Sequence, residues 1–113
     1  MAKEKWPDWE VYTRDRCTCQ YCDASGIGNF NVWKNLTMDH VIPDSAGGSD
    51  QPENKVVCCN RCNVFLGVAI PQGETLSERV QWKRRFLAKK IAQDYDDYDQ
   101  MMKELIPVLW PVE

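Results

Sequence analysis

The spacing of apolar residues along this chain changes several times, and each change predicts a different element. Near the N-terminus, Trp6, Trp9 and Tyr12 recur at three-residue intervals, and Pro7 is a residue type favoured in the first turn of a helix. We therefore predict a short helix over residues 6–15.

The middle of the chain alternates between turn-forming and apolar stretches. Residues 23–35 contain several Gly and Asn residues and predict a loop. Two short strands are expected at residues 36–42 and 56–58, joined by a polar loop over residues 43–54 that includes two consecutive glycines. A helix should begin near Asn63. The middle of the chain thus predicts two strands and a helix around one site.

The last third of the chain predicts one long helix. Thr75-Leu-Ser-Glu78 matches a capping box, in which Thr and Glu side chains satisfy the unpaired amides at a helix start. The helix is expected over about residues 76–105 and should stop before Pro107. Its apolar positions recur along one helix face. They are Val80, Leu87, Ile91, Tyr95, Tyr98, Met102 and Leu105.

Composition and charge indicate one folded domain over residues 1–113. Apolar residues make up 43% of the chain, and it has five Trp, which argues against disorder. The formal charge of −3 argues mildly against a nucleic-acid partner. However, basic residues concentrate between residues 79 and 90 and acidic residues between 94 and 99, so a net-acidic chain can still present a local basic surface.

The cysteines bear on the cellular compartment. The N-terminus has no apolar segment typical of a signal peptide, and no apolar run approaches the length of a membrane span. We therefore expect a cytoplasmic protein with no membrane partner. In a reducing cytosol, metal binding explains six cysteines better than disulfides do.

Four of these cysteines form two Cys-x-x-Cys pairs. Two such pairs can supply four thiolates to one tetrahedral Zn²⁺, and a site filled in this way is structural because it leaves no position for substrate. The alternative is a set of unligated buried thiols or a redox pair. Cys17 and Cys58 do not fit the spacing, and we expect both to be core residues outside the zinc shell. The predicted ligands are Cys19, Cys22, Cys59 and Cys62.

The residues around these cysteines resemble the HNH endonuclease family. The match covers about residues 14–67, and the agreement of several spaced motifs makes it specific. The resemblance implies an α+β fold with a small ββα-metal core, a structural zinc site and flanking helices. The motifs are Arg14-Asp15-x-x-x-Cys19-x-Tyr21-Cys22, Asp39-His40-x-x-Pro43-x-x-x-Gly47-Gly48, Asn54 and Cys59-x-x-Cys62-Asn63.

The resemblance assigns roles to two residues of the central motifs. In this family a histidine activates the water that attacks the phosphate, and His40 would be that general base, since neutral imidazole can accept a proton near neutral pH. The alternative is a loop histidine satisfied by hydrogen bonds. Asn54 resembles the Asn that ties the loop to the strands and so aims the histidine. Its alternative is an exposed loop residue.

By the same resemblance, Asp39 and Asn63 should bind a catalytic metal ion. Both offer hard oxygen ligands, which suit Mg²⁺ or Mn²⁺, and two protein ligands leave positions for water and phosphate. Many family members have His at the position of Asn63, and the Asn favours Mg²⁺. The alternative for Asn63 is a cap of the helix that begins there.

One departure from the family concerns phosphate contacts. Family members often carry Lys followed by Gly after the last motif, where this chain has Leu66-Gly67. Either this phosphate contact is missing or basic residues elsewhere supply it. The alternative for the basic run is a solvated helix face. The candidates for contact with the nucleic acid are Arg61, Arg79, Lys83, Arg84 and Arg85.

The sequence therefore predicts a metal-dependent HNH endonuclease that hydrolyses DNA and leaves 5′-phosphate and 3′-hydroxyl ends. One ββα site cuts one strand, so a monomer should nick DNA and a dimer could break both strands; the oligomeric state stays open. DNA should be bound mostly through its phosphate backbone. The alternative function is a zinc-ribbon-like module that binds nucleic acid or protein without cutting.

Overall fold

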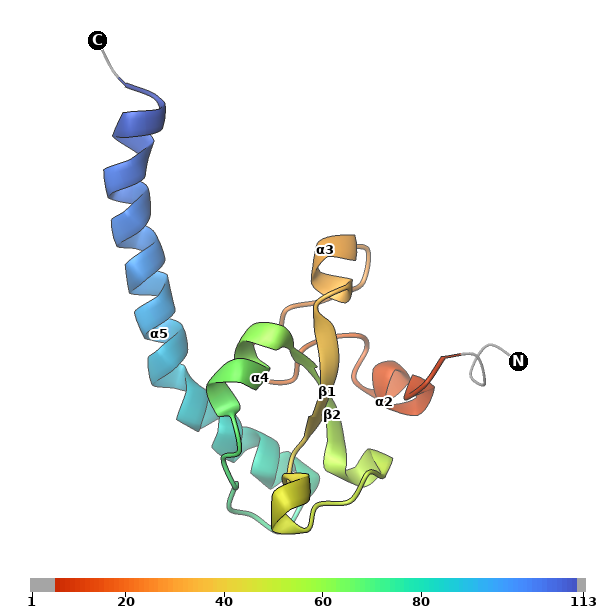
Figure 1. Ribbon diagram of the computed structural model, residues 1–113. Coiled ribbons are helices and arrows are strands. Elements are labelled where there is room, and N and C mark those ends of the chain that lie inside the picture. The colour runs from red at the N-terminus through yellow and green to blue at the C-terminus, as the bar shows by residue number, and fades with distance from the viewer. Residues whose placement is uncertain (1–5, 112–113) are drawn as a thin grey trace.

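The centre of the computed structural model, which describes residues 6–111, is a two-stranded antiparallel sheet followed by a helix. Strand β1 runs Leu36–His40 and strand β2 runs Lys55–Cys59. Helix α4 (Asn60–Leu66) follows β2 directly and packs against both strands (Figure 1). This arrangement is the ββα core that the sequence predicts, and the α+β fold class is confirmed.

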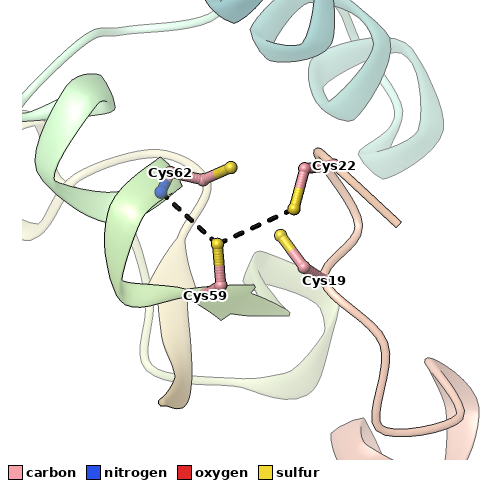
Figure 2. Close-up of side chains that lie close together, drawn as sticks. All are labelled: Cys19, Cys22, Cys59 and Cys62. Atoms are coloured by element: carbon pink, nitrogen blue, oxygen red, sulfur yellow. Dashed lines mark hydrogen bonds between the residues drawn. The ribbon is translucent and has the colours of Figure 1, made fainter. Parts of the chain in front are cut away.

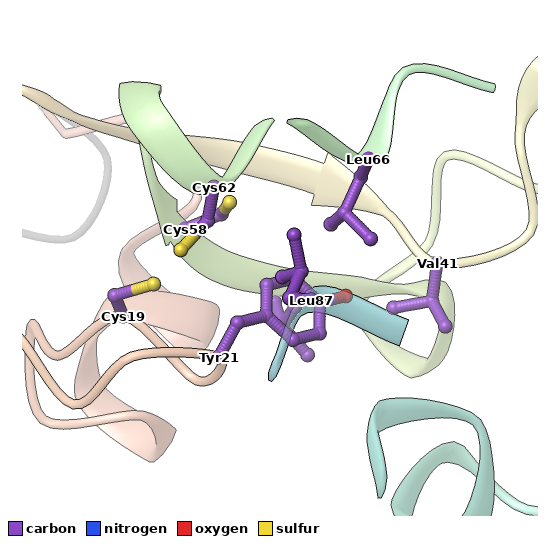
Figure 3. Close-up of a cluster of buried hydrophobic side chains, with 8 residues drawn as sticks. Cys19, Tyr21, Val41, Cys58, Cys62, Leu66 and Leu87 are labelled. Carbon is purple, nitrogen blue, oxygen red and sulfur yellow. The ribbon is translucent and has the colours of Figure 1, made fainter. Parts of the chain in front are cut away.

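Side chains alternate between the two faces of the hairpin, and one face carries the hydrophobic core. Helix α4 and the first turns of the C-terminal helix cover that face. Two zinc-site cysteines, Cys19 and Cys62, belong to this core as well, so the predicted metal site and the core form one cluster. The core residues are Cys19, Tyr21, Val41, Val56, Cys58, Cys62, Leu66 and Leu87 (Figure 3).

The outer edge of β2 is covered by the segment that follows helix α2 (Trp9–Arg14). The Val57 amide donates to the Asp15 carboxylate at 2.9 Å, and the Gln20 amide donates to the Val57 carbonyl at 2.9 Å. Arg14 donates to the Lys55 carbonyl. Because an unpaired strand edge invites pairing with other chains, these bonds protect the hairpin. Arg14 and Asp15 thus have a structural role, and α2 is shorter than the predicted helix at residues 6–15.

Two short helices differ from the predicted boundaries. Helix α3 (Phe30–Trp33) lies within the predicted loop at residues 23–35, and the Asn29 side chain caps it by accepting from the Val32 amide at 3.1 Å. Helix α4 begins three residues before Asn63, because the Cys59 sulfur takes the capping position and accepts from the Cys62 amide at 3.5 Å. The proposal that Asn63 caps this helix is therefore wrong.

Helix α5 (Leu76–Leu109) begins at the predicted capping box. The Thr75 hydroxyl accepts from the Glu78 amide at 3.1 Å, and the Glu78 carboxylate accepts from the Glu74 amide at 3.3 Å. The expectation that the helix stops before Pro107 is wrong. Proline removes only one hydrogen bond from this last turn, and the Trp110 amide still donates to the Ile106 carbonyl at 2.8 Å.

Only the first half of α5 packs on the ββα core. Lys83 and Leu87 are buried, and an ion pair between Arg61 and Asp94 ties the helix to α4. Beyond Asp94 the helix projects away from the core (Figure 1), and Tyr95 is 67% exposed. The apolar spacing therefore predicted the helix correctly, but most of that face is not buried. No helix within residues 6–111 has the length and apolar character needed to cross a membrane.

Candidate metal centre and active site

The four predicted zinc ligands lie together, with all four sulfur atoms within 4.8 Å of one another (Figure 2). The Sγ atoms of Cys22 and Cys59 are 3.7 Å apart. A tetrahedral zinc with bonds of about 2.3 Å places its sulfur ligands about 3.8 Å from each other. The donor set and its spacing therefore fit a Zn²⁺ ion held by Cys19, Cys22, Cys59 and Cys62.

Two backbone features bring the cysteine pairs to one point. In the first pair, the Cys19 amide donates to the Ala24 carbonyl and the Asp23 amide donates to the Cys19 carbonyl, both at 2.9 Å, which closes a tight turn around Cys22. The second pair occupies the capping residue and the first turn of α4. The turn and the helix start thus direct the four sulfur atoms toward one another.

The remaining two cysteines lie outside this cluster, as expected from their spacing. Cys58 is fully buried on β2, which agrees with its predicted place in the core. Cys17 is only partly buried and adopts a left-handed backbone conformation with φ of 48°. The expectation that Cys17 is a core residue is therefore wrong, because it sits in the turn after α2.

Crowding of the thiols moves their pKa values in opposite directions. A hydrogen bond from Cys22, with further ones from Cys58, Cys59 and Cys62, lowers the pKa of Cys19. Contact with Cys19 raises the pKa of Cys59, but contacts with Cys22 and Cys62 lower it by more, to about 6. Contact with Cys19 raises the pKa of both Cys22 and Cys62. The lowered pKa values of Cys19 and Cys59 favour their thiolate forms, and a bound zinc ion would favour the thiolate at all four sulfurs.

His40 lies at the end of β1, opposite Lys55 of β2, and its side chain is 37% exposed. Its Nε2 atom is 2.7 Å from Oδ1 of Asp50, which also lies 3.4 Å from the Lys55 ammonium. The hydrogen bond with His40, together with Lys55, holds the pKa of Asp50 below its usual range. An ionised Asp50 accepts a hydrogen bond from the Nε2–H group of His40, so Nδ1 carries the lone pair that can act as a base.

Asp50 is a site residue that the sequence analysis missed. It lies ten positions after His40 in a polar loop that also contains Asp44 and Glu53. No spacing rule distinguishes it from these other acids, because the loop fold alone decides which carboxylate reaches the histidine.

Asn54 ties that loop to the end of β1. Its side-chain oxygen accepts from the Ile42 amide at 2.9 Å, and its amide nitrogen donates to the carbonyls of Ile42 at 3.0 Å and Ser49 at 2.8 Å. The backbone of Gly48 lies close to Ile42 and to the Asn54 side chain. A Cβ atom at Gly48 would be 1.7 Å from the Ile42 carbonyl oxygen. The buried amide therefore fixes the loop that carries Asp50, and Asn54 is not the exposed loop residue of the alternative.

We predict that Asn54→Ala lowers the free energy of unfolding by about 2–4 kcal/mol, since it removes three partly buried hydrogen bonds. Urea unfolding followed by circular dichroism measures this. Asn31→Ala, at an exposed position on α3, is the matched control and should change stability by less than about 0.5 kcal/mol. Equal stability of the two variants would contradict the bridging role.

Asp39 precedes His40, and its side chain leaves the opposite face of β1, toward the core. The Tyr21 hydroxyl donates to Asp39 Oδ2 at 2.5 Å, and the Lys83 ammonium donates to the same oxygen at 2.8 Å. Within residues 6–111, Oδ1 accepts no hydrogen bond, and no buried side-chain N or O lacks a partner. It follows that Oδ1 contacts solvent and can accept a ligand.

Asn63, the second predicted ligand of the catalytic metal, lies in the middle of α4, which packs against β1. Its side chain is partly buried and makes no hydrogen bond within the described part of the chain, so its amide oxygen is also open to a ligand. An open carboxylate oxygen and an open amide oxygen are a donor set that suits Mg²⁺ or Mn²⁺.

The structure corrects part of the predicted phosphate-binding set. Lys83 is 1% exposed and holds Asp39, so the expectation that it contacts phosphate is wrong. Arg61 and Arg84 are each paired with a carboxylate, Arg61 with Asp94 at 2.9 Å and Arg84 with Asp23 at 3.0 Å. Their charges serve contacts within the protein that the sequence did not reveal.

The other two basic residues are not paired with a carboxylate within residues 6–111. Arg79 is partly buried and donates to the Gly73 carbonyl at 3.0 Å. Arg85 is exposed and makes no hydrogen bond or ion pair within the part of the chain that the structure describes. Among the five predicted residues, Arg85 therefore has a guanidinium group that is available to contact a phosphate.

Comparison with known proteins supports the interpretation of this site. Residues 19–73 match the family described as HNH endonuclease. A segment of 60 residues is 35% identical to part of the CRISPR-associated endonuclease Cas9 of Corynebacterium diphtheriae and covers 52% of this chain. The matched segment is 5% of the length of that relative. These matches confirm the resemblance to the HNH endonuclease family over the ββα core and the cysteine cluster.

Proposed function

We propose that this protein is a metal-dependent endonuclease of the HNH type that hydrolyses phosphodiester bonds in DNA. The observation that supports this most is the His40–Asp50 pair at the end of β1, in a segment that matches the HNH endonuclease family. A protein that only binds nucleic acid does not need an imidazole that a carboxylate holds in one orientation. The zinc ion at the four cysteines would be structural, because a four-thiolate site has no position for substrate.

The proposed reaction begins with proton transfer to His40. Nδ1 takes a proton from a water molecule as its oxygen attacks the phosphorus in line with the 3′ oxygen, and Asp50 stabilises the imidazolium that forms. As the new bond forms, the bond between phosphorus and the 3′ oxygen breaks. The 3′ oxygen leaves with the bonding electron pair and takes a proton from solvent water, which gives 5′-phosphate and 3′-hydroxyl ends. A Mg²⁺ or Mn²⁺ ion bound by Asp39 and Asn63 would supply charge stabilisation for the phosphate and the leaving oxygen.

DNA binding is proposed to rest on the phosphate backbone, with Arg85 and Arg79 as the accessible contacts on α5. Contacts of this kind carry no sequence information, so affinity should fall with salt and vary little with sequence. One site cuts one strand, and a monomer would therefore nick DNA.

We predict that Asp39→Ala and Asn63→Ala each raise the Mg²⁺ concentration required for half-maximal cleavage by about 10-fold or more, with partial recovery at high Mg²⁺. Each substitution removes one oxygen ligand and leaves the four cysteines in place. Asp39→Ala also removes the partner of the buried Lys83 ammonium, so its metal dependence is compared only in folded protein with the parent zinc content. Asp96→Ala, an exposed acid on α5, is the control. Unchanged metal dependence in both site variants would place the catalytic metal elsewhere.

A short end-labelled DNA duplex tests the proposed function. The zinc-loaded protein should cut it only when Mg²⁺ or Mn²⁺ is added, and a ligase should rejoin the products because they carry 5′-phosphate and 3′-hydroxyl ends. Binding of the duplex without any cutting, in the presence of either ion, would favour the zinc-ribbon-like binding module instead.

A further inference from the structure

A buried lysine lies beneath the proposed catalytic site. Lys83 of α5 is 1% exposed, and it comes ten positions after the end of the segment that matches the HNH endonuclease family. Burial of an ammonium group is costly unless a charge and hydrogen bonds compensate it. The structure supplies both, because the Lys83 nitrogen lies 2.8 Å from the Asp39 carboxylate and 6.0 Å from the centre of the Tyr21 ring.

The two donors divide the Asp39 carboxylate into an inner and an outer oxygen. Lys83 and the Tyr21 hydroxyl both donate to Oδ2, and Oδ1 is left in contact with solvent. A carboxylate held in this way cannot rotate without breaking two buried hydrogen bonds. Its outer oxygen therefore keeps one direction.

We infer that Lys83 and Tyr21 are positioning residues that fix Asp39 so that Oδ1 faces a divalent metal ion. The inference rests on the proposed function, in which Asp39 binds the catalytic metal. Carboxylates that ligate metals are commonly hydrogen-bonded on their other oxygen, and loss of such a partner typically weakens metal binding or activity by about 10–100-fold. Helix α5 thus completes the site from outside the family match.

Lys83 has a second effect on a metal ion at Asp39, which opposes the first. Metal binding by Lys83 variants shows which effect dominates. A positive charge 2.8 Å from one carboxylate oxygen repels a cation on the other. If this repulsion dominated, Lys83 would compete with the metal, and its removal would tighten metal binding. If positioning dominates, as we infer, its removal weakens metal binding.

The test is Mn²⁺ binding to the zinc-loaded chain of residues 1–113, measured by the electron paramagnetic resonance signal of unbound Mn²⁺. We expect Lys83→Met to raise the Mn²⁺ dissociation constant by about 10-fold or more, with cleavage recovering most of its maximal rate at saturating Mn²⁺. Lys89→Met, an exposed lysine on the same helix, is the matched control and should leave Mn²⁺ binding unchanged.

A second variant protects the test against misfolding of Lys83→Met. Tyr21→Phe keeps the aromatic ring and removes one donor to Oδ2, so it should raise the dissociation constant by about 3–10-fold, whereas Tyr98→Phe should not. The inference is overturned if folded Lys83→Met binds Mn²⁺ as tightly as the parent or more tightly, while the parent cuts DNA. If Lys83→Met does not fold, the same result in Tyr21→Phe overturns it. A parent that neither binds Mn²⁺ nor cuts DNA would instead overturn the proposed function, and the inference with it.

Discussion

Removal of zinc should unfold this protein. Structural zinc contributes an apparent binding free energy of about 10–16 kcal/mol, which exceeds the stability of a typical small domain. Here the effect should be large because Cys19 and Cys62 belong both to the cysteine cluster and to the hydrophobic core. A strong chelator should therefore abolish the circular dichroism signal of the folded state, and added Zn²⁺ should restore it.

Cysteine variants separate metal binding from other effects of the chelator. Metal analysis should find one zinc per chain in the parent and in Cys17→Ser, because Cys17 lies outside the cluster. Cys62→Ser should lose zinc and fold poorly. A protein that is folded and free of zinc would show that the four cysteines are unligated thiols or a redox pair.

Replacement of His40 by Ala should lower the cleavage rate by about 10²–10⁴-fold, the usual contribution of a general base. The fold and zinc content should not change, since His40 is partly exposed and is not a zinc ligand. Asp44→Ala, an exposed acid of the same loop, is the control and should retain activity. Cleavage by His40→Ala at the parent rate would show that the base has been misassigned.

The loss in Asp50→Asn should be smaller than the loss in His40→Ala. The substitution keeps a group that can bond Nε2 and removes the negative charge that stabilises the imidazolium. A loss in Asp50→Asn as large as in His40→Ala would mean that the carboxylate takes part in the reaction directly.

Local patterns were sufficient to predict the core elements and the cluster of four cysteines. The two Cys-x-x-Cys pairs and the capping box at Thr75 specify their own geometry over four residues, and both occur as expected. The boundary errors are also local. The sulfur of Cys59, and not Asn63, caps helix α4. The last turn of α5 contains Pro107, at which the helix was expected to have ended.

The contacts around the candidate catalytic residues could not be predicted, because they join residues that are distant in sequence. Lys83 reaches Asp39 across 44 positions, and Arg84 reaches Asp23 across 61. In the sequence both cations look like part of a solvated or DNA-binding helix face. Only the packing of α5 on the core shows that Lys83 holds a buried carboxylate and that Arg84 forms a surface ion pair.

Conversion of supercoiled plasmid to its nicked form tests the central claim most directly. The zinc-loaded protein should nick the plasmid when Mg²⁺ or Mn²⁺ is present and should be inactive without either ion. His40→Ala with the same zinc content, assayed in parallel, should be slower by at least about 10²-fold. An intact plasmid in the presence of both ions, or equal nicking by the parent and His40→Ala, would contradict the assignment of this protein as an HNH-type endonuclease with His40 as its base.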